Sequence, residues 1–133
     1  MDRTVPIMIN GKERTLNYSM EVMFDMTDKF GTIKSALEIL EKGNRESFDA
    51  LKWFVIHMAN DGELCRRESG YDHLVMVKES DISLRMKPIE YEEFLVAVVQ
   101  AINLGYNREV KSSDDDIDLE LAEINEKKTT TGD

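Results

Sequence analysis

The feature that most constrains this chain is a short turn between two alternating stretches, followed at once by a helical pattern. Apolar and polar residues alternate on both sides of Asn10-Gly11. Asn-Gly is the dipeptide best suited to a tight type I′ turn, because both of its residues tolerate positive φ. Ser19 then offers a hydroxyl that can cap a helix, and Gly31 can end one. The N-terminal part is therefore predicted to be a β-hairpin that runs directly into a helix.

Beyond Gly31 the pattern is mostly helical. Apolar residues recur at helical spacing, and polar or glycine-containing turns separate the segments. The third segment is apolar nearly all round, as expected of a helix buried on several sides. The expected elements are a helix from Thr32 to about Lys42 with Ile33, Ala36, Leu37 and Leu40 on its buried side, a helix from Ser47 to about Asn60, a short helical turn capped by Ser80 or Asp81 and ending at Met86, and a helix from Pro88 to Gly105.

The stretch between the third helix and the short turn is harder to interpret. Asp61-Gly62 is expected to stop the third helix, because glycine is unfavourable inside helices, and residues 61–72 are expected to form a polar loop. Leu74–Val77 fits either a short strand or a helical turn, and periodicity does not decide between them. The fold class predicted is mainly α, with an N-terminal β-hairpin, a compact bundle of about four to five helices and an acidic C-terminal tail.

The charge and cysteine content narrow the environment and the partners. The 133 residues carry a net charge of −10, which disfavours nucleic acid and anionic membrane surfaces as partners and favours basic proteins. Cys65 is the only cysteine, which excludes an internal disulfide and fits a reducing cytosol. No signal peptide is visible, and no apolar run approaches the about 20 residues that span a bilayer. We therefore expect a cytoplasmic protein.

Composition shifts near Val110 and divides the chain in two. Residues 1–110 are expected to form the helical domain, whereas residues 111–133 contain eight acidic residues and three lysines, a net charge of 3 − 8 = −5. Such a tail is usually disordered. It also carries an apolar row at helical spacing, so a short helix that forms against a partner is the second interpretation. The row consists of Ile117, Leu121 and Ile124.

Methionines give the first helix its other notable property. Met20, Met23 and Phe24 share a helical stripe that Thr27 and Phe30 continue, and Met26 lies nearby. Methionine is flexible and polarisable, so such a stripe either fills the core or lines a surface that accommodates a partner helix. We take Met20, Met23, Phe24 and Met26, with Ile117, Leu121 and Ile124 from the tail, as the candidate partner-binding residues.

No catalytic, metal or cofactor site is predicted. His57, Cys65 and His73 could in principle form a Cys-His pair, but no third orienting group accompanies them, and they are poor material for a zinc site. The run of alternating aspartates at residues 114–118 resembles the start of a calcium loop. The glycine and glutamate that such a loop needs are replaced by Leu119 and Asn125. We therefore expect a protein that is not an enzyme.

The chain resembles the tail assembly chaperones of long-tailed bacteriophages and prophages of Gram-positive bacteria. The resemblance covers about residues 5–106, and it consists of apolar patterns with turns. The residues that carry it are Ile9-Asn10-Gly11-Lys12 with Leu16 and Tyr18, the helix Met20–Phe30 closing on Gly31, Thr32-Ile33 with Ala36-Leu37, a long apolar helix ending near Asn60-Asp61-Gly62, and the helix from Pro88 to Gly105 with its segment Ala97–Ile102.

The resemblance implies a function as well as a fold. Such a protein binds the helical tape-measure protein in the cytoplasm of the infected bacterium, keeps it soluble, helps to recruit tail-tube subunits and is absent from the mature virion. Members of the family often self-associate, so the resemblance also implies homo-oligomers. Two alternatives stay open from the residues: an acidic adaptor or inhibitor that binds a basic protein, and a small enzyme that uses His57, Cys65 or His73.

Overall fold

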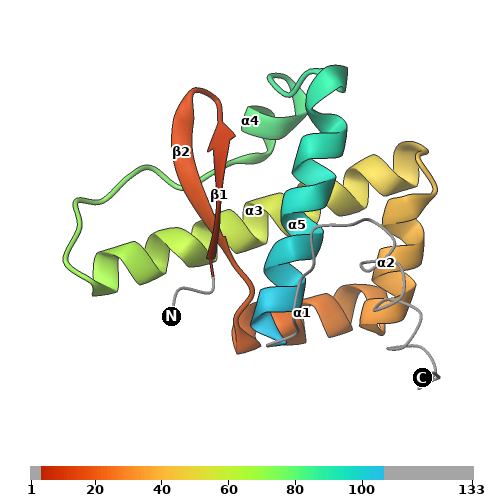
Figure 1. Cartoon of the computed structure of the whole chain (residues 1–133), viewed down its shortest axis with the longest axis horizontal. Coiled ribbons are helices and arrows are strands. Elements are labelled where there is room, and N and C mark those ends of the chain that lie inside the picture. Colours follow the sequence, from red (N-terminus) through yellow and green to blue (C-terminus); the bar gives the residue numbers. More distant parts are fainter. Residues whose placement is uncertain (1–3, 107–133) are drawn as a thin grey trace.

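The chain begins with the predicted hairpin. The computed structural model describes residues 4–106 (Figure 1). Strands β1 (Thr4–Ile9) and β2 (Lys12–Asn17) pair in antiparallel register. Asn10 and Gly11 have φ values of 53° and 77°, the type I′ geometry whose twist matches that of the two strands. The turn predicted from the sequence is therefore confirmed.

The rest of the described chain is helical, apart from the turns and one extended segment. Within residues 4–106 the hairpin is followed by five α-helices and one 3₁₀ turn, which confirms the predicted mainly α class with its N-terminal hairpin. The predicted tail, residues 111–133, lies outside the described residues. The helical elements are α1 (Met20–Phe30), α2 (Ile33–Glu41), α3 (Arg45–Glu68), α4 (Glu79–Ser83), the 3₁₀ turn η1 (Pro88–Glu90) and α5 (Tyr91–Gly105).

Side-chain caps fix where the first three helices begin. The Ser19 hydroxyl accepts a hydrogen bond from the Val22 amide, and the Thr32 hydroxyl accepts one from the Ser35 amide, as expected for N-caps. The third helix begins earlier than predicted. Its cap is Asn44, which shares a reciprocal capping box with Ser47, so the residue predicted to start the helix instead lies in its first turn.

The predicted end of the third helix is wrong, because α3 continues through Asp61-Gly62 to Glu68. Gly62 serves close packing here. A Cβ on this residue would lie 1.9 Å from the carbonyl oxygen of Thr15 in β2, so only glycine allows the strand to approach the helix this closely. Gly105 plays a similar part at the end of α5, where a Cβ would lie 2.7 Å from the ring of Tyr18.

The segment before the last helix also departs from prediction. Leu74–Val77 forms neither a strand nor a helical turn. The N-cap of α4 is Lys78, whose amide donates to the Asp81 carboxylate, and α4 ends at Ser83. Pro88 opens the turn η1, which leads directly into α5, so the proline sits where its fixed φ favours the start of a helix.

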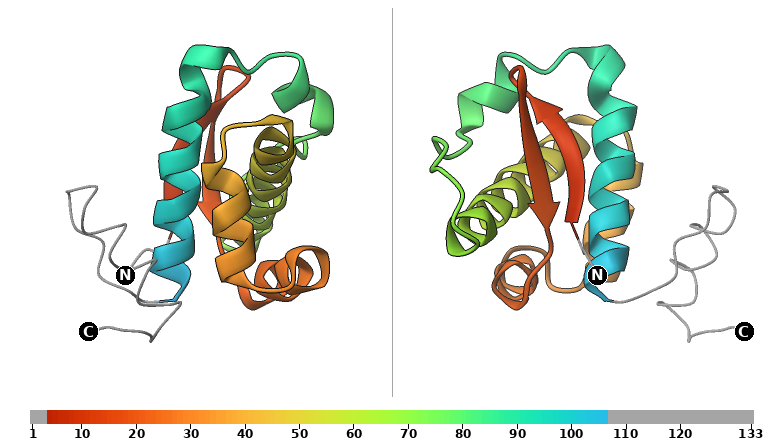
Figure 2. Two further views of the ribbon diagram at one scale, coloured as in Figure 1. Left: turned by 90° about the vertical axis from the view of Figure 1, so that its right-hand side faces the viewer. Right: turned by 60° about the vertical axis from the view of Figure 1, so that its left-hand side comes forward.

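The core lies between the hairpin and the two long helices. β2 packs on α3 and β1 packs on α5, while α2 and α1 cover the other end of α3 (Figure 2). The predicted buried side of the second helix is confirmed for Ala36, Leu37 and Leu40, and Ile33 is half-buried. The largest fully buried apolar side chains are Phe54, Leu16, Met26, Leu40, Leu51, Met58, Ile82 and Ile102.

Candidate binding surface

Helix α1 leaves large apolar side chains exposed. Met20 is 64% exposed and Phe24 is 57% exposed, and they are one turn apart on the same side of the helix. Met23 lies next to them and is half-buried, packed against the core. We call these three residues the outer face of α1. Large apolar side chains that gather on the surface are typical of sites that bind other molecules.

The direction of the core explains why this face is open. Val22 and Met26 are 3% and 2% exposed, and they point to nearly the opposite side of the helix from Met20 and Phe24, because residues two apart in a helix are about 200° apart. The predicted stripe is thus split: Met23 and Phe30 pack against the core, whereas Met20 and Phe24 do not. Met26 was a candidate for binding, but it lies in the core and is unavailable to a partner in this structure.

A row of carboxylates runs beside the outer face of α1. Glu21, Asp25 and Asp28 are all exposed and follow the spacing i, i+4, i+7, which aligns their side chains along one side of the helix. None of the three forms an ion pair with another residue in the part of the chain that the structure describes. The row is therefore free to attract basic groups. The tail candidates Ile117, Leu121 and Ile124 lie outside the described residues.

The cysteine and the histidines lie in ordinary surroundings. The exposed thiol of Cys65 accepts a hydrogen bond from the side-chain amide of Asn17. Partial burial, together with the carboxylates of Asp61 and Glu68, raises the pKa of this thiol, which disfavours the nucleophilic thiolate. The ring of His57 stacks on Trp53 at 3.9 Å between centroids, and His73 is exposed. Among residues 4–106, no cluster of His, Cys, Asp or Glu is suited to holding a metal ion.

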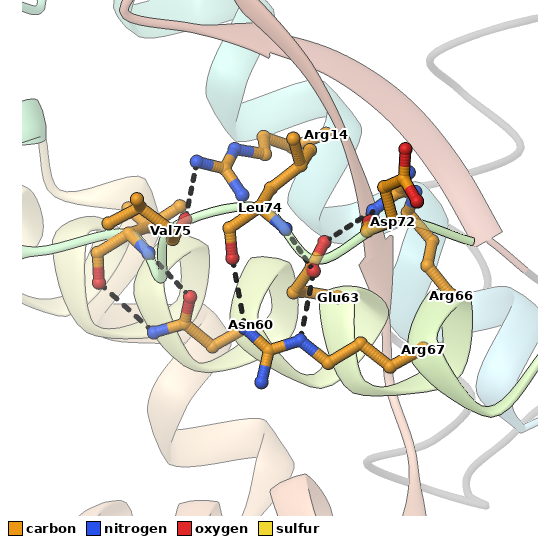
Figure 3. A network of polar contacts seen from close by, with 9 residues as sticks. Arg14, Asn60, Glu63, Arg66, Arg67, Asp72, Leu74 and Val75 are labelled. Atoms are coloured by element: carbon orange, nitrogen blue, oxygen red, sulfur yellow. Dashed lines mark hydrogen bonds and ion pairs between the residues drawn. The ribbon is translucent and has the colours of Figure 1, made fainter. Parts of the chain in front are cut away.

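The most strongly perturbed group is one that sequence analysis missed. Glu63 is 2% exposed and lies between α3 and the extended segment of residues 71–78 (Figure 3). Its carboxylate accepts hydrogen bonds from Arg66 at 2.7 Å, Arg67 at 3.0 Å and the Leu74 amide at 2.7 Å. Burial alone raises the pKa of Glu63, but these three bonds outweigh it and lower the pKa from 4.5 to about 2.

The same network fastens the segment of residues 71–78 to the body of the protein. The Asn60 amide side chain bonds both the N–H and the C=O of Val77, as a neighbouring strand would. Arg67 donates to the Leu74 carbonyl, and Arg14 donates to the Val75 carbonyl at 2.7 Å. The spacing of Glu63 from its two arginines, i+3 and i+4, was a usable signal. We interpret this cluster as structural, because ion pairing and backbone contacts account for its shifted pKa.

Two open grooves lie elsewhere on the surface. The larger, of about 750 Å³, is lined by Phe30, Trp53 and His57 and by both acidic and basic side chains. The smaller, of about 580 Å³, lies between the hairpin tip and the segment from α4 to α5, and its lining includes Met8, Leu84 and Phe94. Its two acidic and two basic residues balance, whereas the larger groove has three carboxylates and two lysines.

Comparisons with known proteins add no relative. No family model, curated protein or solved structure matches this chain. None of the helices between Thr4 and Tyr106 is long and apolar enough to cross a membrane. The outer face of α1, with its row of carboxylates, is therefore the candidate site that the described residues themselves supply.

Proposed function

We propose that the protein is a non-enzymatic tail assembly chaperone of a long-tailed bacteriophage or prophage. It binds the helical tape-measure protein, keeps it soluble and helps to recruit tail-tube subunits. Two kinds of support exist. The sequence resembles that family over about residues 5–106, and the fold is mostly helical, as the resemblance implies.

The single observation that carries the proposal is the outer face of α1. A tape-measure protein is a long helix, and before assembly its apolar side needs cover. Met20 and Phe24, with the half-buried Met23 beside them, offer adaptable apolar contact on the surface of an acidic body, and flexible methionines allow one surface to accept varied apolar side chains. In this proposal the protein works in the cytoplasm of the bacterial host, forms homo-oligomers as members of the family often do, and is left out of the finished virion.

A pull-down tests the proposal. The intact chain is expressed together with the neighbouring phage genes, and the proteins that it retains are identified. We expect recovery of a long helical tape-measure protein, which aggregates when the chain is omitted. A version that ends at Val110 shows whether the acidic segment contributes to binding. Failure of the intact chain to retain any tape-measure protein would exclude the proposed function.

An acidic adaptor or inhibitor is the second candidate. The net charge of −10 and the exposed carboxylates on α1 favour a basic protein as the partner. This candidate predicts that replacing the acids of residues 114–126 abolishes function, whereas apolar substitutions on α1 do not. Recovery of a compact basic protein, in place of a long helical one, would support the adaptor.

A further inference from the structure

We propose that the outer face of α1 binds an amphipathic helix that carries a row of basic side chains beside its apolar row. The proposal rests on the proposed function, because it names the chemistry of the helix that the chaperone holds. It is argued from two features of α1: the exposed side chains of Met20 and Phe24, and the carboxylates of Glu21, Asp25 and Asp28.

The two rows run side by side along the helix. Met20 and Phe24 are four residues apart, as are Glu21 and Asp25, and Asp28 continues the second row by three residues. Residues at these spacings lie above one another on a helix surface. The 11 residues of α1 make about three turns, a length of about 16 Å. A partner helix that lies along α1 therefore meets the apolar row and the acidic row together.

Charge decides which kind of helix fits. The chain's own segment of residues 111–133 has an apolar row, Ile117, Leu121 and Ile124, but its net charge is 3 − 8 = −5. A second copy of the chain brings a net charge of −10. Both are net negative, as is the row of Glu21, Asp25 and Asp28, and net charges of the same sign weaken binding. A helix with lysine or arginine beside its apolar row fits the charge of this surface.

The grooves on the protein do not compete as the site for such a helix. The groove at Trp53 combines Lys29 and Lys52 with Glu46, Asp49 and Glu79. Its two lysines offset most of this acidic charge, so it selects a basic helix less strongly than the unpaired row on α1 does. On the surface of α1, exposed apolar side chains lie beside an acidic row that forms no ion pair with another described residue.

Two labelled model helices test the proposal on the full chain. They share the same row of leucines, and one carries lysines beside that row where the other carries glutamates. Fluorescence anisotropy measures the two dissociation constants in about 0.15 M salt, where the Debye length is about 8 Å. We expect the lysine helix to bind at least about tenfold more tightly than the glutamate helix. Equal binding of the two helices would overturn the proposal.

Matched variants locate the contact. Two variants of α1 should each raise the dissociation constant of the lysine helix by about tenfold or more. The first carries Met20→Ser and Phe24→Ser, and the second carries Glu21→Lys, Asp25→Lys and Asp28→Lys. The apolar control is Ile89→Ser, because Ile89 on η1 is 89% exposed. The charge control alters the same number of exposed carboxylates on other elements: Glu13→Lys, Glu38→Lys and Glu68→Lys. Both controls should change the dissociation constant by less than about twofold.

The outcomes separate this proposal from the proposed function. Equal losses in the α1 and control charge variants would mean unspecific attraction and would overturn the proposal. A dimer that dissociates when α1 is altered, seen by analytical ultracentrifugation, would assign the face to a second copy and would also overturn it. If the intact chain retains tape-measure protein but the α1 variants retain it equally well, the chaperone function stands and this inference fails. Unchanged melting temperatures show that each variant is folded.

Discussion

At the scale of single residues, Glu63 links two parts of the chain that the backbone does not pair. Its carboxylate joins Arg66 and Arg67 of α3 to the amide of Leu74. A carboxylate that is 2% exposed is stable only when such partners replace the water it has lost. The segment of residues 71–78 therefore depends on side chains for contacts that a strand would obtain from its neighbour.

Replacing this carboxylate should destabilise the protein. Glu63→Gln keeps the shape of the side chain and one acceptor oxygen, but it leaves Arg66 and Arg67 without a buried counter-charge. We expect the free energy of unfolding to fall by about 3 kcal/mol, measured by urea denaturation. Glu68→Gln, an exposed residue of the same helix, should change it by less than about 0.5 kcal/mol. A loss of similar size in both variants would contradict the role given to Glu63.

The pH dependence follows from the same contacts. Because the pKa of Glu63 is about 2 in the folded protein and 4.5 ordinarily, ionised Glu63 stabilises the fold above about pH 4.5. This stabilisation, about 3 kcal/mol, is lost as the pH falls from 4.5 towards 2. The difference in unfolding free energy between wild type and Glu63→Gln should therefore shrink over this range. A difference that stays constant from pH 6 to pH 2.5 would refute the assignment.

At the scale of elements, the position of the hairpin depends on two glycines. Gly62 lets β2 lie against the backbone of α3, and Gly105 lets Tyr18 lie against the end of α5. The hairpin is thereby held between the two longest helices (Figure 2). Tyr18 adds a contact of its own, since its hydroxyl lies 3.1 Å from that of Tyr106. Helix propensity alone would favour alanine at both positions.

A substitution to alanine separates packing from propensity. Gly62→Ala gains about 1 kcal/mol of helix propensity, but its Cβ would collide with the backbone of Thr15. We expect a net loss of about 2 kcal/mol or more in the free energy of unfolding, because two backbones must move apart. Leu64→Ala, at a half-exposed position on the same helix, is the control and should cost less than about 1 kcal/mol. A stabilised Gly62→Ala variant would disprove the close contact.

Local signals were enough to predict the hairpin, the starts of α1 and α2 and the role of Pro88, because each depends on residues next to it in the sequence. The length of α3 was not predictable in this way. Gly62 resembles a stop signal unless Thr15 is known to lie against it. The outer face of α1 was predicted in part: Met20 and Phe24 are exposed, but Met26 is buried, because the direction of the core depends on how α1 packs against α2 and α3.

At the scale of the whole molecule, charge opposes compactness. The chain carries a net charge of −10, of which −5 belongs to residues 111–133. The described part therefore holds surface carboxylates that repel one another, such as those along α1. Self-repulsion of this kind destabilises a compact state and opposes unspecific aggregation. It also suits a protein that prevents another from aggregating.

Salt should therefore stabilise the fold. Raising sodium chloride from about 0.02 M to about 0.5 M shortens the Debye length to less than about 5 Å, and we expect the melting temperature to rise by about 4 °C, which corresponds to about 1 kcal/mol. The variant with Glu13→Lys, Glu38→Lys and Glu68→Lys has a net charge of −10 + 6 = −4. Its melting temperature should rise less with salt. Calorimetry at both salt concentrations provides the check, and a falling melting temperature would argue against net repulsion.

The contacts at Gly62 and Gly105 also bear on how relatives of this chain can be found. Most surface positions can change freely, but these two cannot accept a side chain unless Thr15 and Tyr18 move away. Distant relatives should thus keep a glycine deep inside the long third helix and another at the end of the last one, while the sequence around them drifts. We expect that pair, together with Asn10-Gly11 at the hairpin turn, to persist after overall similarity has faded.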